Sequence, residues 1–383
     1  MTERRSTAKE RSLATAKRLV VKIGSALLVE EEGDIRRKWL EALCDDVAAL
    51  RKNGTEVVLV SSGAIAVGRR RLGLEAGALW LEEKQAAAAT GQIRLAHAYQ
   101  EALARHGITC AQVLLTLDDT EERRRHLNAR STLSTLLKLD AVPVINENDT
   151  VATSEIRFGD NDRLAARVSA MISADALVLL SDIDGLYTAD PRKDKSAQFI
   201  AEIGEMNAEI EAMAGEAPPG YSSGGMVTKL AAARIAMAAG CRMLIANGRQ
   251  LNPLQAVIDG AKCSWFLPQA EPKTARKRWI GGTLKPAGTL TVDAGALGAL
   301  RSGRSLLPAG VIKVEGKFER GDAVVVADAA GNEIARGLSA YSAKDARAIM
   351  GHKSREIAGL LGFRGRDEII HRDDLVLTES GSP

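Results

Sequence analysis

Two lysines in this chain are placed where they could neutralise an anion. Lys22 lies near the end of the apolar run Arg18–Ile23 and is followed by Gly24. A buried lysine without a partner is costly, and a bound anion would compensate its charge. Lys229 closes the first turn of a predicted helix that follows the glycine-rich segment 222–225, and these are the components of a polyphosphate site. A lysine that reaches solvent beside a turn is the alternative for Lys22.

Polar side chains also follow other apolar runs. Ser61–Gly63 come after Glu56–Val60, and helix capping by serine explains them as well as ligand binding does. Asn146–Asp149 are four amide or acid residues in a row, which is more than a turn requires. A second such cluster, Gly159–Asp162, opens a predicted helix. The two clusters predict a polar pocket with acceptors for an ammonium group and amides for a carboxylate.

Several common catalytic patterns are absent from the sequence. It contains neither the P-loop pattern G-x-x-x-x-G-K-[ST] nor the dinucleotide pattern G-x-G-x-x-G, so a nucleotide would bind by another scheme. The five histidines lie outside the polar clusters, which leaves no Ser/His/Asp set and no metal triad. A carboxylate nucleophile fits better, because its reference pKa of about 4.3 leaves it ionised at neutral pH. Lysines and Mg²⁺ would then relieve the repulsion between two anions.

These clusters stand at the ends of alternating strands and helices. Strands are predicted at Arg18–Ile23, Glu56–Val60, Ile108–Leu115, Ala141–Ile145 and Ala176–Leu180. Helices are predicted at 36–52, 82–105, 120–139 and 161–173. Near-continuous apolar strands of this kind are buried on both faces, so the pattern predicts a three-layer α/β/α sandwich with a mostly parallel sheet. Ligands bind such sheets beyond the carboxyl ends of the strands.

The sequence changes character after residue 268. Proline, paired glycine and a basic string indicate a linker over 269–286, and short alternating strands then predict a small, mainly β module over 287–370. Strands are expected at 289–292, 311–314, 323–326 and 333–337, with helices near 294–301 and 343–350. The larger domain is expected over 17–268, after an N-terminal extension at 1–16.

Composition limits the classes of protein to consider. The 383 residues suggest two domains, and 52 basic against 49 acidic side chains do not favour a nucleic-acid or membrane-surface protein. The four cysteines form no C-x-x-C pair, the N-terminus lacks the apolar core of a signal peptide, and no apolar run is long enough to span a membrane. We therefore expect a cytoplasmic protein with no membrane association.

Taken together, the motifs resemble the amino-acid kinase family. Within that family they are most similar to the members that phosphorylate L-glutamate and carry a C-terminal PUA module. The resemblance covers about residues 17–375 and rests on the segments VVKIGSALL, VSSGAIAVG, PVINENDTVATSEI, GDND, LLSDIDGLYTADPR and SSGGMVTKL. It implies an amino-acid kinase fold and a phosphotransferase with a carboxyl group as acceptor. The reaction would be ATP-dependent phosphorylation of the γ-carboxylate of L-glutamate, the first step of proline biosynthesis.

The resemblance also implies roles for individual residues. Lys22 and Lys229 would contact the transferring phosphoryl group, with Asp162 holding both lysines in place. The glutamate-binding residues would be Ser62, Gly63, Asn146, Asp149 and Asn161. The ATP-binding residues would be Lys22, Ser181, Asp182, Ser223, Gly224, Gly225, Met226 and Lys229. Asp149 would accept the α-ammonium group of glutamate, and amide donors would hold its carboxylates. No side chain is assigned as a metal ligand.

Partners and alternatives follow from the same resemblance. It implies Mg²⁺ with ATP as co-substrate, feedback inhibition by proline, a homodimer or homotetramer, and hand-over of the product to glutamyl phosphate reductase. One alternative is a kinase of another small carboxylate or of carbamate. The other is an RNA-binding protein that acts through its PUA module, which the slight basic excess and the scarcity of aromatic residues do not favour.

Overall fold

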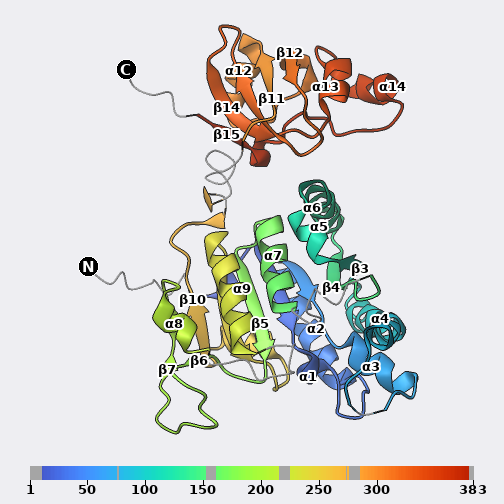
Figure 1. Ribbon diagram of the computed structural model, residues 1–383, viewed down its shortest axis with the longest axis vertical. Helices are drawn as coiled ribbons and strands as arrows, with labels where there is room; N and C mark the ends of the chain where they lie inside the picture. Colours follow the sequence, from blue (N-terminus) through green and yellow to red (C-terminus); the bar gives the residue numbers. More distant parts are fainter. Residues whose placement is uncertain are drawn as a thin grey trace. The chain divides into compact units, whose positions relative to one another are not determined.

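The computed structural model describes residues 11–75, 77–151, 161–214, 225–272, 274–275 and 285–378. The chain divides into two compact units, residues 1–272 and 273–383 (Figure 1). The division falls inside the expected linker. The bounds given above for the extension, the two domains and the linker stay predictions.

The first unit is built on an eight-stranded sheet with the strand order β3-β4-β2-β1-β5-β9-β10-β8. The strands are β1 (Arg18–Ile23), β2 (Glu56–Val60), β3 (Cys110–Leu115), β4 (Val142–Glu147), β5 (Ala176–Ser181), β8 (Glu202–Ile203), β9 (Arg242–Asn247) and β10 (Cys263–Phe266). The six strands from β3 to β9 run parallel, and β10 pairs with β9 in the antiparallel sense. The mostly parallel sheet is thereby confirmed. A short hairpin, β6 (Leu186–Tyr187) with β7 (Phe199–Ile200), lies outside this sheet.

Helices cover both faces of the sheet, which confirms the three-layer sandwich (Figure 1). They are α1 (Ser25–Leu28), α2 (Arg37–Lys52), α3 (Ala64–Arg71), α4 (Leu81–Ala104), α5 (Leu117–Glu121), α6 (Arg123–Lys138), α7 (Asn161–Ile172), α8 (Ala208–Ala212), α9 (Met226–Ala238) and α10 (Pro253–Ile258). One apolar core joins the sheet to α2, α4 and α10, and the other joins it to α6, α7 and α9.

Strand β1 shows how the sequence assigns side chains to these faces. Leu19, Val21 and Ile23 belong to the core with α2 and α4, whereas Val20 belongs to the core with α7 and α9. Successive side chains of a strand point to opposite faces, so Lys22 lies on the same face as Val20. The central lysine is therefore directed toward α7 and α9.

One predicted helix is two helices in the structure. The sequence predicts a single helix over 120–139, but α5 ends at Glu121 and α6 begins at Arg123. Thr116 and Asp119 form a reciprocal capping box that starts α5 before the predicted position, and Glu122 is extended between the two helices. The remaining predicted helices of this unit agree with α2, α4 and α7 to within one residue at each end.

The second unit has its own five-stranded sheet, with the order β12-β11-β13-β14-β15, and its own apolar core. Its elements are β11 (Gly288–Val292), α12 (Ala294–Arg301), β12 (Val311–Gly316), β13 (Ala323–Ala327), β14 (Glu333–Leu338), α13 (Ala343–Ile349), α14 (Ile357–Leu361) and β15 (Leu375–Leu377). The four predicted strands and two predicted helices are present, whereas α14 and β15 were not predicted. The small β-rich module is thus confirmed.

The described residues include all four cysteines and the helices given above. All four cysteines are free thiols. Among the helices of the described ranges, none has the length and apolar character needed to cross a bilayer.

Candidate active site

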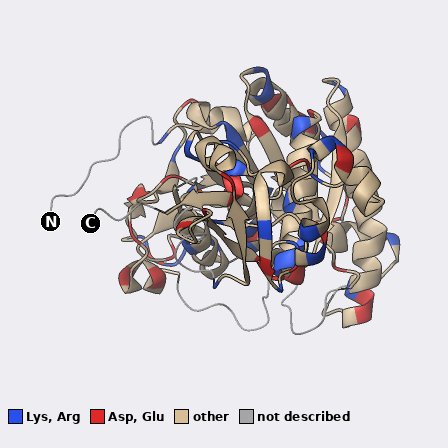
Figure 2. Cartoon of the chain, turned by 90° about the horizontal axis from the view of Figure 1, so that it is seen from above, with Lys and Arg blue, Asp and Glu red and all other residues tan. Residues whose placement is uncertain are grey.

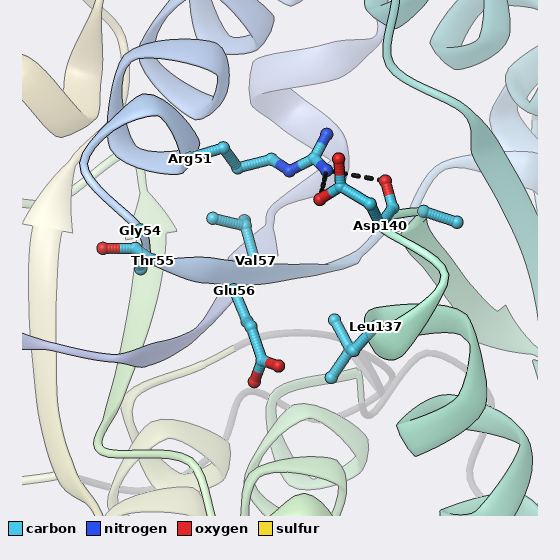
Figure 3. Close-up of a pocket in the computed structure, with 8 residues that line it drawn as sticks. Arg51, Gly54, Thr55, Glu56, Val57, Leu137 and Asp140 are labelled. Carbon is cyan, nitrogen blue, oxygen red and sulfur yellow. Dashed lines mark hydrogen bonds and ion pairs between the residues drawn. The ribbon is translucent and has the colours of Figure 1, made fainter.

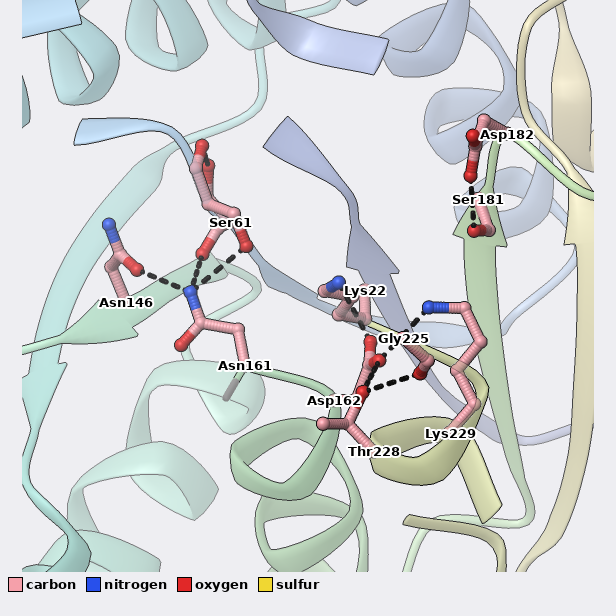
Figure 4. Close-up of polar contacts among 11 residues, drawn as sticks. Lys22, Ser61, Asn146, Asn161, Asp162, Ser181, Asp182, Gly225, Thr228 and Lys229 are labelled. Carbon is pink, nitrogen blue, oxygen red and sulfur yellow. Dashed lines mark hydrogen bonds and ion pairs between the residues drawn. The ribbon is translucent and has the colours of Figure 1, made fainter. Parts of the chain in front are cut away.

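Two buried lysines from different elements meet on one carboxylate (Figure 4). Lys22 comes from the end of β1, Asp162 from the first turn of α7 and Lys229 from the first turn of α9. Lys22 Nζ lies 2.7 Å from Asp162 Oδ1, and Lys229 Nζ lies 3.1 Å from Asp162 Oδ2. Lys22, Asp162 and Lys229 are 6%, 1% and 3% exposed, respectively. Because α7 packs against both β1 and α9, Lys22 and Lys229 lie close together although they are 207 positions apart in the sequence.

The electrostatics of this group are those of a shared counter-ion. Burial alone would raise the pKa of Asp162, but the ammonium groups of Lys22 and Lys229 hold that pKa well below its usual range. Thr228 Oγ1 donates a further hydrogen bond to Asp162 Oδ2 at 2.9 Å. One fixed anion therefore keeps two cations close together in a buried position, where an anionic ligand can meet both.

A second polar group forms around Asn161, the residue before Asp162. Asn161 Nδ2 donates to the main-chain oxygen of Ser61 at 2.8 Å and to Asn146 Oδ1 at 2.9 Å. Ser62 Oγ is a third acceptor at 3.0 Å. Asn161 Oδ1 is buried and has no hydrogen-bond partner among the described residues. The expectation that amide donors hold the substrate's carboxylates therefore does not extend to Asn161, because its N–H groups are used within the protein.

The turn after β2 brings a main-chain segment beside this group. Gly63 has a φ of +99° and is the N-cap of α3, whose first turn receives no side-chain capping bond. Serine capping is therefore the wrong explanation of Ser61 and Ser62. A Cβ atom on Gly63 would lie 2.7 Å from Val29 Cγ2, so both the backbone conformation and the space favour glycine here.

Asp149 follows β4 and is largely buried. Burial, with a smaller contribution from the charge of Glu147, raises the pKa of Asp149 to about 7. A carboxylate in this condition is stabilised by any cation that reaches it. Asp149 is thus suited to an ammonium group.

On the other side of Lys22, β5 ends in a polar pair. Ser181 Oγ donates to Asp182 Oδ1 at 3.2 Å, and Arg249 lies 3.8 Å from the Asp182 carboxylate (Figure 4 shows the first pair). Gly225 is the N-cap of α9 and Met226 its first residue. The remaining predicted ATP-binding residues, Ser223 and Gly224, lie outside the described residues, as do 152–160 of the acidic–amide segment.

Two residues of the site were not predicted from the sequence. Thr228 adjoins Lys229, and its position in the first turn of α9 was a usable signal. Gln92 lies in the middle of α4 and accepts a hydrogen bond from Asn146 Nδ2 at 2.8 Å. Glutamine is a common residue inside helices, so nothing in the local sequence marks Gln92.

A pocket at the opposite ends of the strands contains none of these residues (Figure 3). It is lined by residues before and at the start of β2, by residues that precede β4, and by the ion pair between Arg51 and Asp140. Ligands of parallel sheets bind at the carboxyl ends of the strands, and this pocket lies at the amino ends. The group around Lys22 and Asp162 is therefore the stronger candidate.

The comparisons with known proteins bear on the same residues. The model of the amino acid kinase family matches residues 17–247, which is more than half of the chain and includes every element of the site described above. The chain belongs to the amino acid kinase family. The model of the PUA domain matches residues 288–361, so the second unit contains a PUA domain.

Relatives in this family are similar over nearly their whole length. The glutamate 5-kinase of Paramagnetospirillum magneticum is 69% identical, with 95% of this chain and 99% of the relative covered. The glutamate 5-kinase of Agrobacterium fabrum is 61% identical, with 96% of this chain and 94% of the relative covered. That of Paracoccus denitrificans is also 61% identical, with 95% and 98% covered.

Proposed function

We propose that this protein is a glutamate 5-kinase, which transfers the γ-phosphoryl group of ATP to the γ-carboxylate of L-glutamate in proline biosynthesis. The observation that carries the proposal is the pair of buried lysines on Asp162, because two fixed cations suit a transferring phosphoryl group. The acceptor follows from the relatives, which are named glutamate 5-kinases and are similar over both units.

The residues support an in-line transfer without a general base. The γ-carboxylate of glutamate is ionised at neutral pH, so its oxygen can attack the γ-phosphorus directly. The new oxygen–phosphorus bond forms as the bond from the γ-phosphorus to the bridging oxygen of ADP breaks, giving an acyl phosphate and ADP. Lys22 and Lys229 would spread positive charge over the phosphoryl oxygens, while Asp162 keeps the two ammonium groups from repelling each other.

The proposed roles of the other residues divide between the two substrates. Ser62, Gly63, Asn146, Asp149 and Asn161 would form the glutamate site, with Asp149 taking the α-ammonium group. Ser181, Asp182, Ser223, Gly224, Gly225 and Met226 would form the ATP site with the two lysines. The support for this division is the position of the residues. The first group gathers at the carboxyl ends of β2 and β4 and at the start of α7, and the described members of the second gather at the carboxyl end of β5 and at the start of α9.

ATP use implies a divalent metal, and we propose Mg²⁺. Both oxygens of Asp162 face lysines, and among the described residues no three His, Cys, Asp or Glu side chains are placed to hold an ion. The residues therefore fit a metal that arrives bound to the nucleotide phosphates and keeps most of its waters. Bound there, it would screen the charge of those phosphates.

Several further features belong to the proposal. They are inhibition by proline through the glutamate site, assembly as a homodimer or homotetramer, hand-over of the labile product to glutamyl phosphate reductase, and a cytoplasmic location. Competition between proline and glutamate in steady-state kinetics would test the first of these.

A coupled ADP-release assay tests the function directly. We expect turnover with L-glutamate and at most trace activity with aspartate, N-acetylglutamate or carbamate. The Lys229→Ala variant should lose kcat by orders of magnitude while still binding glutamate. Turnover with one of the other acceptors in preference to glutamate would establish the alternative kinase, and an unchanged kcat in Lys229→Ala would remove that lysine from the mechanism.

A further inference from the structure

The orientation of the Asn161 amide is determined by its neighbours. Its N–H groups face two oxygens that can only accept, the main-chain oxygen of Ser61 and Oδ1 of Asn146. Rotating the amide by half a turn would place Asn161 Oδ1 against both of these acceptors and replace two hydrogen bonds by two oxygen–oxygen contacts, which is costly in a buried site. The atom that has no hydrogen-bond partner among the described residues is therefore Asn161 Oδ1, an acceptor.

The orientation of Asn146 is determined in the same way. Asn146 Oδ1 accepts from the main-chain N–H of Glu147 at 2.9 Å as well as from Asn161, and Asn146 Nδ2 donates to Gln92 Oε1 at 2.8 Å. Gln92, Asn146 and Asn161 are all buried. The hydrogen bonds thus form a chain of three amides that begins on α4 and ends at the unpartnered oxygen of Asn161 (Figure 4 shows its last two members).

Helix packing fixes the start of this chain. Gly91, the residue before Gln92, lies so close to α3 that a Cβ atom would be 1.8 Å from the main-chain oxygen of Ala64. Gly68 of α3 approaches the main-chain oxygen of Ala87 equally closely. Helix α4 therefore cannot slide along α3. This close packing fixes the position of Gln92 along the helix axis relative to the turn at Ser62 and Gly63.

The chemistry of glutamate then selects the group that can meet Asn161 Oδ1. At neutral pH both carboxylates of glutamate are ionised and can only accept hydrogen bonds, so its α-ammonium group is its only donor. We propose that Gln92 is a positioning residue that, through Asn146, presents Asn161 Oδ1 as a hydrogen-bond acceptor for the ammonium group of the substrate. This inference rests on the proposed function, and it names a second acceptor for that ammonium beside Asp149.

The test compares three variants of the full-length protein. Gln92→Met removes the acceptor with little change in size, Gln92→Glu keeps an acceptor at the same position, and Gln100→Met makes the first change at an exposed site of the same helix. For Gln92→Met we expect a rise of about tenfold in the KM for glutamate, with the KM for ATP and kcat within twofold of wild type. Gln92→Glu should recover most of this loss, and Gln100→Met should behave as wild type.

Glutarate, which lacks the ammonium group, identifies the group that is recognised. Its inhibition constant against glutamate should change less than twofold in Gln92→Met. An equal loss of affinity for glutarate and glutamate, or a parallel rise in the KM for ATP, would overturn the proposal in favour of a merely structural role, and so would an unchanged KM for glutamate. Failure of the proposed function would be distinct, because wild-type protein would then not phosphorylate glutamate at all.

Discussion

Asp162 is the residue on which the proposed chemistry depends. In the Asp162→Asn variant, two buried ammonium groups would face each other without a counter-charge. Breaking a buried pair in this way costs about 3–5 kcal/mol, so we expect the thermal midpoint to fall on the order of 10 °C. We also expect kcat to fall at least 100-fold, because the lysines would no longer hold their positions.

The control makes the same chemical change at an ion pair whose carboxylate is exposed. Asp140 pairs with Arg51, its side chain is 93% exposed and its φ is +60°, which asparagine tolerates (Figure 3). An ion pair with a solvent-exposed carboxylate contributes about 0–1 kcal/mol, and Arg51 would still donate to the main-chain oxygen of residue 140. Asp140→Asn should therefore change neither kcat nor the thermal midpoint appreciably. Differential scanning calorimetry and the ADP-release assay measure both variants. Similar effects in the two variants would mean that burial of the Asp162 pair has no special role.

Asp149 should impose a pH dependence on glutamate binding. Its pKa of about 7 leaves it largely neutral at pH 6 and ionised at pH 8, while the carboxylates of the substrate stay ionised throughout. The kcat/KM for glutamate at saturating ATP should therefore rise about tenfold from pH 6 to pH 8. Because the folded-state pKa lies above the usual value, this residue's contribution to the stability of the free protein is lost as the pH rises toward 7.

The variant Asp149→Asn separates this residue from other titrating groups. It should show a higher KM for glutamate and a flat profile over the same pH range, with the KM for ATP little changed. A variant that keeps the tenfold rise would assign the titration to a different group.

At this scale the sequence could suggest residue types but not their hydrogen-bond directions. The cluster of Asn146–Asp149 was visible because four polar residues follow an apolar strand. The use of the Asn161 N–H groups inside the protein depends on Ser61, which is 100 positions away in the sequence, and Gln92 is 54 positions from Asn146. Such partners are set by the packing of elements, which no local pattern records.

At the scale of elements, the contact between α3 and α4 positions the glutamate side of the site. The variant Gly91→Ala would place a Cβ atom 1.8 Å from the Ala64 oxygen, far inside the van der Waals contact distance, so the helices must separate. Ala64 directly follows Gly63, and we expect kcat/KM for glutamate to fall more than tenfold together with a lower thermal midpoint. Steady-state kinetics and calorimetry provide the measurements.

Gly298 is the matched control for a helical glycine. It lies within α12, and a Cβ atom there would meet nothing within 4 Å. Gly298→Ala should stabilise that helix by up to about 1 kcal/mol and leave the kinetics unchanged. If Gly91→Ala were equally harmless, the close approach of α3 and α4 would not position the site.

Helices and strands with a strong sequence pattern could be predicted accurately, whereas those with an ambiguous pattern could not. Buried parallel strands such as β1, β2 and β5 were predicted to within one residue of their observed ends because each is an apolar run bounded by polar residues or glycine. The direction of β10 could not be predicted, since an apolar strand has the same pattern in either sense. The capping box of Thr116 and Asp119 starts α5, and the extended backbone of Glu122 separates α5 from α6, which no periodic pattern in the sequence indicates.

At the scale of the whole molecule, the distribution of charged residues bears on the alternative function, RNA binding. Basic and acidic side chains are interspersed over the elements of the chain (Figure 2). Residues 287–365, which contain the PUA domain, carry 11 basic and 8 acidic side chains and three aromatic residues. Non-specific affinity for nucleic acid comes mainly from many phosphate contacts, and stacking platforms need aromatic rings.

We therefore expect no retention of RNA in a filter-binding assay with the full-length protein at about 150 mM salt, where phosphate contacts are strongly screened. At about 50 mM salt, weak retention that disappears steeply on raising the salt concentration would reflect counter-ion release alone and agree with this expectation. Added RNA should also leave the kcat of the ADP-release assay unchanged. Retention that persists at the higher salt concentration, or a kcat that responds to RNA, would contradict it, because the charge of this unit could not account for either result.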